Sequence, residues 1–346
     1  MPDRGSFARS RQWLANARFS EGLKTLAEAR TIASDEKTRK ALTLFQEAVA
    51  IDPGFGRAHF YVGIASELRG EHRRAIEEFE GLVGDDRAPR LELLYNLALS
   101  WFHVYETQGY GKALAYIDAI VRECQAGRSG KRPDVADEMR RMSTLLLAKT
   151  LRSQVLSHRA IRENGAAAEA TRQEATSEAT SVLEYLEKNL NALPAEVAQD
   201  VRWGAWNALG HIDHMGGRHK DVERLKKAEK AFDKALEYSP GNYRVLSNLA
   251  ANHLFIAQLT GERDRLQQAK TLFDQVIGLR TDYDYAHYRL ADVALEEEDY
   301  DEALRQIQLA REHPSEMTSE TLDRLEEQIR ERQPRKPTRA YNLDEL

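Results

Sequence analysis

Residues that cross-link or interrupt a chain are scarce in this sequence. Cys124 is the only cysteine among 346 residues, which excludes an intramolecular disulfide and a zinc site built from cysteines. Such a chain suits a reducing compartment, so we expect a cytoplasmic protein. The first residues, MPDRGSFARSRQWLANARFSEG, lack the apolar core of a secretion signal, and no run reaches the roughly 20 apolar residues of a membrane-spanning helix. We therefore expect no membrane association.

Proline and glycine are also few, with 9 and 20 residues, whereas charged residues make up 31% of the chain. This composition is typical of a helical protein with wide solvated faces. The formal net charge of −6 argues against a general nucleic-acid binder, which needs a basic face. The sequence contains no G-x-S-x-G nucleophile motif and no HExxH zinc motif, so we expect neither an enzyme nor a cofactor.

What the sequence does contain is a repeated pattern of small and aromatic residues. Two of its intervals, from Ala41 to Ala75 and from Ala269 to Ala303, are 34 residues long. The five copies are Ala41, Phe45, Ala48 and Pro53; Ala75, Phe79, Leu82 and Arg87; Ala228, Phe232, Ala235 and Pro240; Ala269, Phe273, Val276 and Thr281; and Ala303, Ile307, Ala310 and Ser315.

A second motif precedes these copies. The segment WNALG, with Trp206, Leu209 and Gly210, reproduces a W-x-x-L-G pattern, and Gly63 takes the glycine place upstream. Both motifs resemble those of the tetratricopeptide repeat family, over roughly residues 38–123 and 206–313. The resemblance implies an all-α fold, a right-handed solenoid of about six or seven antiparallel helix pairs. It also implies a non-enzymatic scaffold or adaptor that binds a protein or peptide partner.

The small residues have a direct physical purpose. Gly63 on a first helix and Ala75 on the following second helix mark a crossing where two helices approach to ~8–10 Å. Phe79 is expected to fill the wider space beside that crossing. The Ala228, Ala269 and Ala303 positions should therefore be buried.

Composition predicts four parts. Residues 1–130 are N-terminal repeats led by a cap of two short helices within 7–30, and residues 131–193 are an oversized helical pair, with a flexible linker as the alternative. Residues 194–333 are C-terminal repeats ending in a capping helix whose apolar stripe is Leu322, Leu325 and Ile329, and residues 334–346 are a disordered tail. The segment TQGYGKA is expected to be a long turn.

The resemblance also implies a site. In the family the first helices line a concave groove that holds peptides, and a subgroup binds a terminal carboxylate with lysine, arginine and asparagine on three consecutive first helices. Asn248 and Arg289 match those residue types. Side chains offset from the Leu-Ala packing stripe should be exposed, and they can pair with a peptide backbone or carboxylate. The predicted groove residues are Asn207, His211, Arg244, Asn248, Tyr285, Tyr288 and Arg289.

Three alternatives remain open. His211 and His214 lie three residues apart on one helical face, so a metal-dependent enzyme with a third ligand from elsewhere is one of them. A nucleic-acid-binding repeat is another, with Arg335, Lys336 and Arg339 as phosphate contacts. The N-terminal first helices carry apolar residues in the groove places, which would bind an apolar partner or pack on the chain itself: Phe60, Ile64, Tyr95, Leu99 and Phe102.

Overall fold

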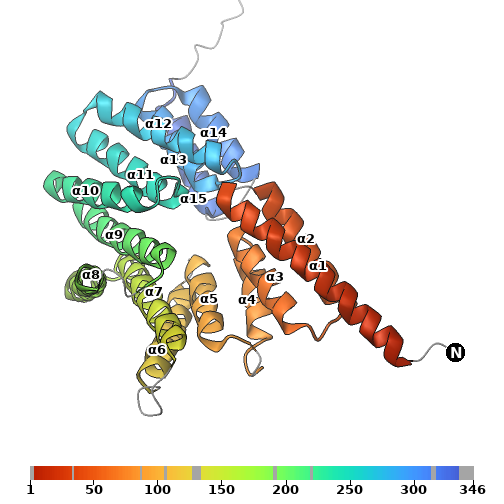
Figure 1. The fold of residues 1–346 in the computed structure, drawn as a ribbon. Coiled ribbons are helices and arrows are strands. Elements are labelled where there is room, and N and C mark those ends of the chain that lie inside the picture. The colour runs from red at the N-terminus through yellow and green to blue at the C-terminus, as the bar shows by residue number, and fades with distance from the viewer. Residues whose placement is uncertain are drawn as a thin grey trace, which may run out of the picture. The chain divides into compact units, whose positions relative to one another are not determined.

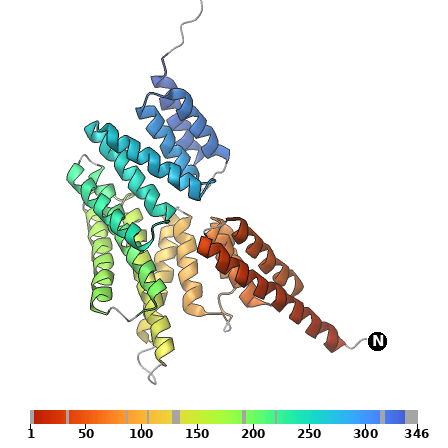
Figure 2. The same cartoon turned by 45° about the horizontal axis from the view of Figure 1, so that its top comes forward.

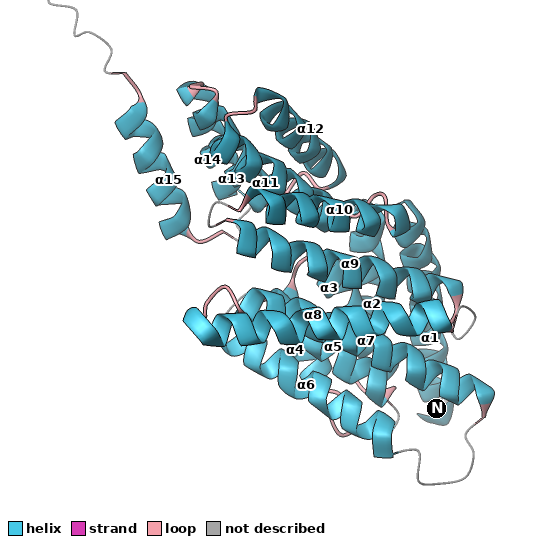
Figure 3. Ribbon diagram, turned by 90° about the vertical axis from the view of Figure 1, so that its left-hand side faces the viewer, coloured by secondary structure: helices cyan, strands magenta, loops and turns pink. Residues whose placement is uncertain are grey.

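The computed structural model describes residues 4–32, 35–85, 88–104, 107–126, 134–189, 193–218, 221–312 and 317–334. Within these ranges the chain forms fifteen α-helices and no strand (Figure 3). None of the helices described is both long and apolar enough to cross a membrane.

The helices are labelled in chain order (Figure 1). Those of the N-terminal half are α1 (Arg4–Ile32), α2 (Asp35–Ile51), α3 (Gly56–Leu68), α4 (His72–Glu80), α5 (Arg90–His103), α6 (Thr107–Ala126), α7 (Val135–Arg159) and α8 (Gly165–Lys188). Those of the C-terminal half are α9 (Ala195–Gly217), α10 (Val222–Tyr238), α11 (Tyr243–Thr260), α12 (Arg263–Leu279), α13 (Asp284–Glu296), α14 (Tyr300–Glu312) and α15 (Ser319–Arg332).

The chain divides into two compact units. The first unit consists of Met1–Gly217 and Lys230–Pro240, and the second unit consists of Arg218–Glu229 and Gly241–Leu346. Helix α10 therefore contributes its first half to the second unit and its second half to the first unit.

Each unit is a series of helix pairs. In the first unit α1 packs on α2, α3 on α4, α5 on α6 and α7 on α8, and α9 then packs against both α7 and α8. In the second unit α11 packs on α12 and α13 on α14, with α15 against α14 (Figure 2). Short connections make the partners of each pair antiparallel. The expected all-α fold of antiparallel helix pairs is confirmed.

The repeated small and aromatic residues form the contacts between paired helices, as the sequence predicts. Burial of these residues contributes roughly 25 cal/mol per Å² of apolar surface removed from water. The positions that are 0% exposed are Ala41, Phe45, Ala48, Ala75, Phe79, Ala228, Phe232, Ala235, Ala269, Phe273, Val276, Ala303 and Ala310.

Three of the buried phenylalanine rings lie directly on a glycine of the preceding helix. A Cβ atom added at Gly63 would lie 2.5 Å from Cε1 of Phe79, closer than any real Cβ contact. The Phe79 ring therefore leaves no room for a side chain at position 63. The same relation joins Gly22 to Phe45 at 2.6 Å and Gly210 to Phe232 at 2.5 Å.

The leading cap differs from the prediction of two short helices, which is wrong. Helix α1 runs without a break from Arg4 to Ile32, and Ser20 is an exposed residue in its middle. Gly22 lies inside this helix, and its missing side chain makes room for the Phe45 ring of α2.

The prediction of a long turn at TQGYGKA is also wrong, because Thr107 begins α6 and the whole segment is helical. A Cβ atom at Gly109 would lie 2.5 Å from the main-chain oxygen of Trp101, so this glycine lets α6 approach the end of α5. Lys112 extends over the Trp101 ring, with Nζ 3.7 Å from its centroid, a cation–π contact that fastens the same junction.

The middle of the chain carries two long helices, α7 with 25 residues and α8 with 24. Helix α8 is rich in alanine, and it buries Ala168, Ala175 and Ala179 together with Val182 and Leu186. The capping helix α15 buries the predicted stripe of Leu322, Leu325 and Ile329. The residue ranges expected for the four parts stay predictions, and the tail beyond residue 334 lies outside the described residues.

Candidate functional site

Two first helices of the second unit, α11 and α13, carry a dense group of aromatic and arginine side chains. Helix α11 starts at a defined place because the Asn242 side chain accepts hydrogen bonds from the main-chain nitrogens of Arg244, at 3.2 Å, and Val245, at 3.3 Å. On α13, Tyr288, Arg289 and Asp292 follow Tyr285 by three, four and seven residues, which puts these side chains on one face of the helix. We call the group the aromatic-arginine surface; its members are Arg218, Phe255, Tyr285, Tyr288, Arg289 and Asp292.

Arg289 lies at the centre of this surface. Its guanidinium carbon is 5.1 Å from the ring centroids of both Tyr285 and Tyr288 and 5.7 Å from that of Phe255. Its Nε donates to the Tyr285 hydroxyl at 3.0 Å, and its Nη1 donates to Asp292 Oδ2 at 2.9 Å. These contacts hold the guanidinium in one position without consuming all five of its N–H donors.

Arg218 adds a second cation to the same surface. It is exposed, and its guanidinium carbon is 4.5 Å from the centroid of Phe255. Partial burial and the neighbouring Arg289 charge hold the pKa of Arg218 below its ordinary value, and Asp292 does not offset them. Two guanidinium groups thus lie close together at this surface.

A row of tyrosines continues the surface toward the start of α11. The rings of Tyr243 and Tyr283 meet edge to face with centroids 5.2 Å apart, and Tyr283 is 6.0 Å from Tyr285. Arg280 donates to the Tyr243 hydroxyl at 2.7 Å, and the Arg244 guanidinium carbon is 5.3 Å from the Tyr243 ring centroid. Tyr283 is itself buried, at 5% exposure, and links the Tyr243 ring to the Tyr285 ring.

The predicted groove residues divide between the two units. Tyr285, Tyr288 and Arg289 meet in the second unit, where Arg244 and the half-buried Asn248 lie on α11. Asn207 and His211 lie on α9 in the first unit.

The sequence reasoning missed several members of the surface. Phe255 and Asp292 were detectable in principle, because Phe255 follows Asn248 by seven residues and Asp292 follows Arg289 by three, which places each on the same helical face. Arg218 lies just beyond the end of α9, and no local pattern marks it.

The exposure expected for His211 is wrong. Its side chain is 7% exposed because α7 covers it: the ring stacks on His158 with centroids 4.0 Å apart, and Nδ1 lies 3.1 Å from Ser157 Oγ. His214 is buried as well, at 6%. In the described ranges no third potential metal ligand joins these two histidines, and His219 lies outside those ranges.

In the first unit the chain itself covers part of the predicted apolar face. Phe60 is 8% exposed and packs against Phe79, with ring centroids 5.6 Å apart. Phe102 is 5% exposed and meets the His158 ring of α7 edge on at 5.1 Å. Of the two readings left open for these residues, packing on the chain itself is the one that holds for Phe60 and Phe102.

Comparison with known proteins gives one family. The tetratricopeptide repeat model matches residues 26–92, which span α2 to α4, and residues 256–316, which span α12 to α14. No curated protein matches the chain.

The comparison with solved structures matches this chain, among others, to two proteins. One is a tetratricopeptide repeat protein from Parabacteroides merdae, with 12% identity, a TM-score of 0.46 and coverage of 91% of this chain and 99% of its own. The other is a complex of the TPR2AB domain of yeast Sti1 with pHSP90, with 15% identity, a TM-score of 0.29 and coverage of 94% and 99%. The two segments 26–92 and 256–316 are thus similar to tetratricopeptide repeats.

Proposed function

We propose that the protein is a non-enzymatic interaction scaffold whose second unit binds an acidic peptide segment of a partner protein. The observation that carries the proposal is the pair of arginines, Arg218 and Arg289, whose guanidinium groups share the Phe255 ring at 4.5 and 5.7 Å. A carboxylate of the partner would bind there, and Arg244 and Asn248 would extend the site along α11.

The charges at this surface favour such a ligand. Arg289 pairs with Asp292, and Arg218 is exposed and has the Arg289 charge close to it. An incoming carboxylate relieves that like-charge repulsion and forms charge-assisted hydrogen bonds, which are the strong ones in proteins. Each such bond contributes about 1.5–3 kcal/mol.

The aromatic residues supply the contact area. Tyrosine and phenylalanine side chains bury much surface while losing little conformational entropy, and tyrosine and arginine dominate the binding energy at protein interfaces. The hydrogen bonds from Arg289 to Tyr285 and Asp292 order the surface before the ligand arrives, so less entropy is lost on binding.

The test begins with peptide display on the full-length protein. We expect a random peptide library to be enriched in sequences with clustered aspartate and glutamate, and fluorescence polarisation to give the affinity of one selected peptide. Arg218→Glu should weaken that peptide at least about 10-fold, because each 1.4 kcal/mol is a factor of ten.

The matched control is Arg57→Glu in the first unit. The Arg57 guanidinium carbon also lies over an aromatic ring, 5.1 Å from the centroid of Phe19, so the control repeats the cation–π contact away from the surface. It should leave the affinity unchanged. Equal binding by Arg218→Glu, or a selected pool without acidic residues, contradicts the proposal. Salt-sensitive retention on RNA instead of peptides would favour the nucleic-acid alternative.

A further inference from the structure

Three helices of the first unit bring one carboxylate and two imidazoles together. Glu67 lies in the last turn of α3, His72 begins α4, and His103 ends α5. The Nδ1 atom of His72 is 3.0 Å from Glu67 Oε2, and Nδ1 of His103 contacts Glu67 Oε1. The Ser100 hydroxyl also donates to Glu67 Oε2, at 2.7 Å. Three side chains, one from α4 and two from α5, thus meet at the single carboxylate of Glu67 on α3.

The cluster is nearly closed to solvent. Side-chain exposure is 7% for Glu67, 12% for His72 and 11% for His103. A buried carboxylate is costly unless a positive charge accompanies it. A cation bound at Glu67 would supply that charge.

We propose that Glu67, His72 and His103 bind a Zn²⁺ ion. Two imidazole nitrogens and one carboxylate oxygen are a ligand set that zinc takes, whereas Mg²⁺ and Ca²⁺ prefer oxygen alone. Their ligand atoms all lie within 4.8 Å of one another. Tetrahedral zinc with bonds of about 2.0–2.1 Å separates its ligands by about 3.3 Å, so ordinary side-chain rotations suffice. Each imidazole binds through Nδ1 and carries its proton on Nε2.

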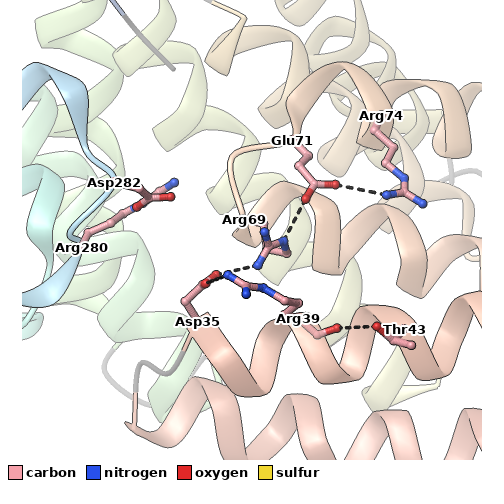
Figure 4. Close-up of polar contacts among 8 residues, drawn as sticks. All are labelled: Asp35, Arg39, Thr43, Arg69, Glu71, Arg74, Arg280 and Asp282. Carbon is pink, nitrogen blue, oxygen red and sulfur yellow. Dashed lines mark hydrogen bonds and ion pairs between the residues drawn. The ribbon is translucent and has the colours of Figure 1, made fainter. Parts of the chain in front are cut away.

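The surroundings fix the ligands in place. The hydrogen bond from Ser100 orients the carboxylate, as outer partners of metal ligands usually do. Arg69 stabilises the turn between Glu67 and His72, because it donates hydrogen bonds to Asp35 and to Glu71, each at 2.8 Å (Figure 4). A bound ion would join α3, α4 and α5.

The chain offers a matched control in His59. Its Nδ1 lies 2.7 Å from Glu78 Oε2, which is the same imidazole–carboxylate contact without a second imidazole. In the described ranges no third ligand joins this pair.

The experiment uses tag-free full-length protein that has been treated with a chelator and dialysed. Calorimetric titration with ZnCl₂ should give one ion per chain, MgCl₂ should give no binding, and Co²⁺ should produce the visible absorption of a low-coordinate site. His72→Gln and His103→Gln should each weaken Zn²⁺ at least about 100-fold, because each removes a direct ligand. His59→Gln should bind as the wild type does.

Folded wild-type protein without saturable Zn²⁺ binding overturns the proposal, and the cluster is then a hydrogen-bond network only. Binding that persists in both His72→Gln and His103→Gln places the ion elsewhere and also overturns it. If these variants fail to fold, zinc X-ray absorption on the wild type decides: two imidazoles in the coordination shell support the site, and fewer refute it.

Discussion

Replacing Gly63 by alanine tests the contact between a glycine and an aromatic ring that recurs along the first unit. The new Cβ atom would lie 2.5, 2.7 and 2.9 Å from three carbons of the Phe79 ring, where carbon atoms normally stay about 3.5–4.0 Å apart. Phe79 is 0% exposed, so the ring has no free space to move into. Overpacking of this kind costs about 1–3 kcal/mol.

An opposing effect must be separated from that cost. Alanine is a better helix former than glycine by about 1 kcal/mol, so the net destabilisation at Gly63 should be about 0–2 kcal/mol. Gly111 on α6 isolates the opposing effect, because nothing lies within 4 Å of a Cβ atom built there. Gly111→Ala should therefore stabilise the first unit by about 0.5–1 kcal/mol. The two variants should differ by the full overpacking cost.

Tryptophan fluorescence during urea unfolding is the appropriate measurement. All four tryptophans, at positions 13, 101, 203 and 206, belong to the first unit, so the signal reports that unit separately from the second. Phe79→Leu should reduce the penalty of Gly63→Ala, with a coupling of at least about 0.5 kcal/mol in a double-mutant cycle. If Gly63→Ala stabilises the unit as much as Gly111→Ala does, the proposed contact is refuted.

Two further predictions concern the second unit. Asn242→Ala should lower its stability by about 1 kcal/mol, because the side chain caps α11, and circular dichroism during urea unfolding measures this loss; an unchanged midpoint would contradict the cap. Burial lowers the pKa of His253, and its imidazole also accepts a hydrogen bond from Arg265 at 3.0 Å. Below the ordinary pKa of 6.5 the unfolded chain therefore binds a proton at His253 that the folded chain does not. The free energy of unfolding should thus fall as the pH falls below 6.5, by about 1.4 kcal/mol for each unit by which the pKa is lowered. His253→Gln should make the free energy of unfolding depend less on pH, and an equally steep dependence in the variant would contradict this prediction.

The helix pairs were predictable because their packing is periodic and local in sequence. Ala228, Phe232 and Ala235 follow a helical spacing that puts them on one face, and all three are fully buried. Two glycines were not predictable in this way. Gly22 and Gly109 look like turn residues, but each lies inside a helix where a neighbouring ring or main-chain oxygen occupies the place of a side chain. The atoms that require the glycine belong to another helix, so the local sequence pattern does not indicate them.

The site was less predictable, because its members come from elements far apart in the chain. Tyr285, Tyr288 and Arg289 are neighbours on one helix and were found, whereas Arg218 meets Phe255 only through the folding of α11 and the residues before α10. The cluster of Glu67 and His103 spans two helix pairs and has no local spacing at all.

A charge swap tests peptide binding at the second unit most directly. An acidic peptide selected on the wild type is compared with a copy in which one carboxylate residue is replaced by arginine, and both are titrated against wild type and Arg218→Glu. The wild type should bind the acidic peptide more tightly, and Arg218→Glu should bind the arginine-containing copy more tightly. If Arg218→Glu keeps the wild-type preference, the aromatic-arginine surface does not bind the peptide.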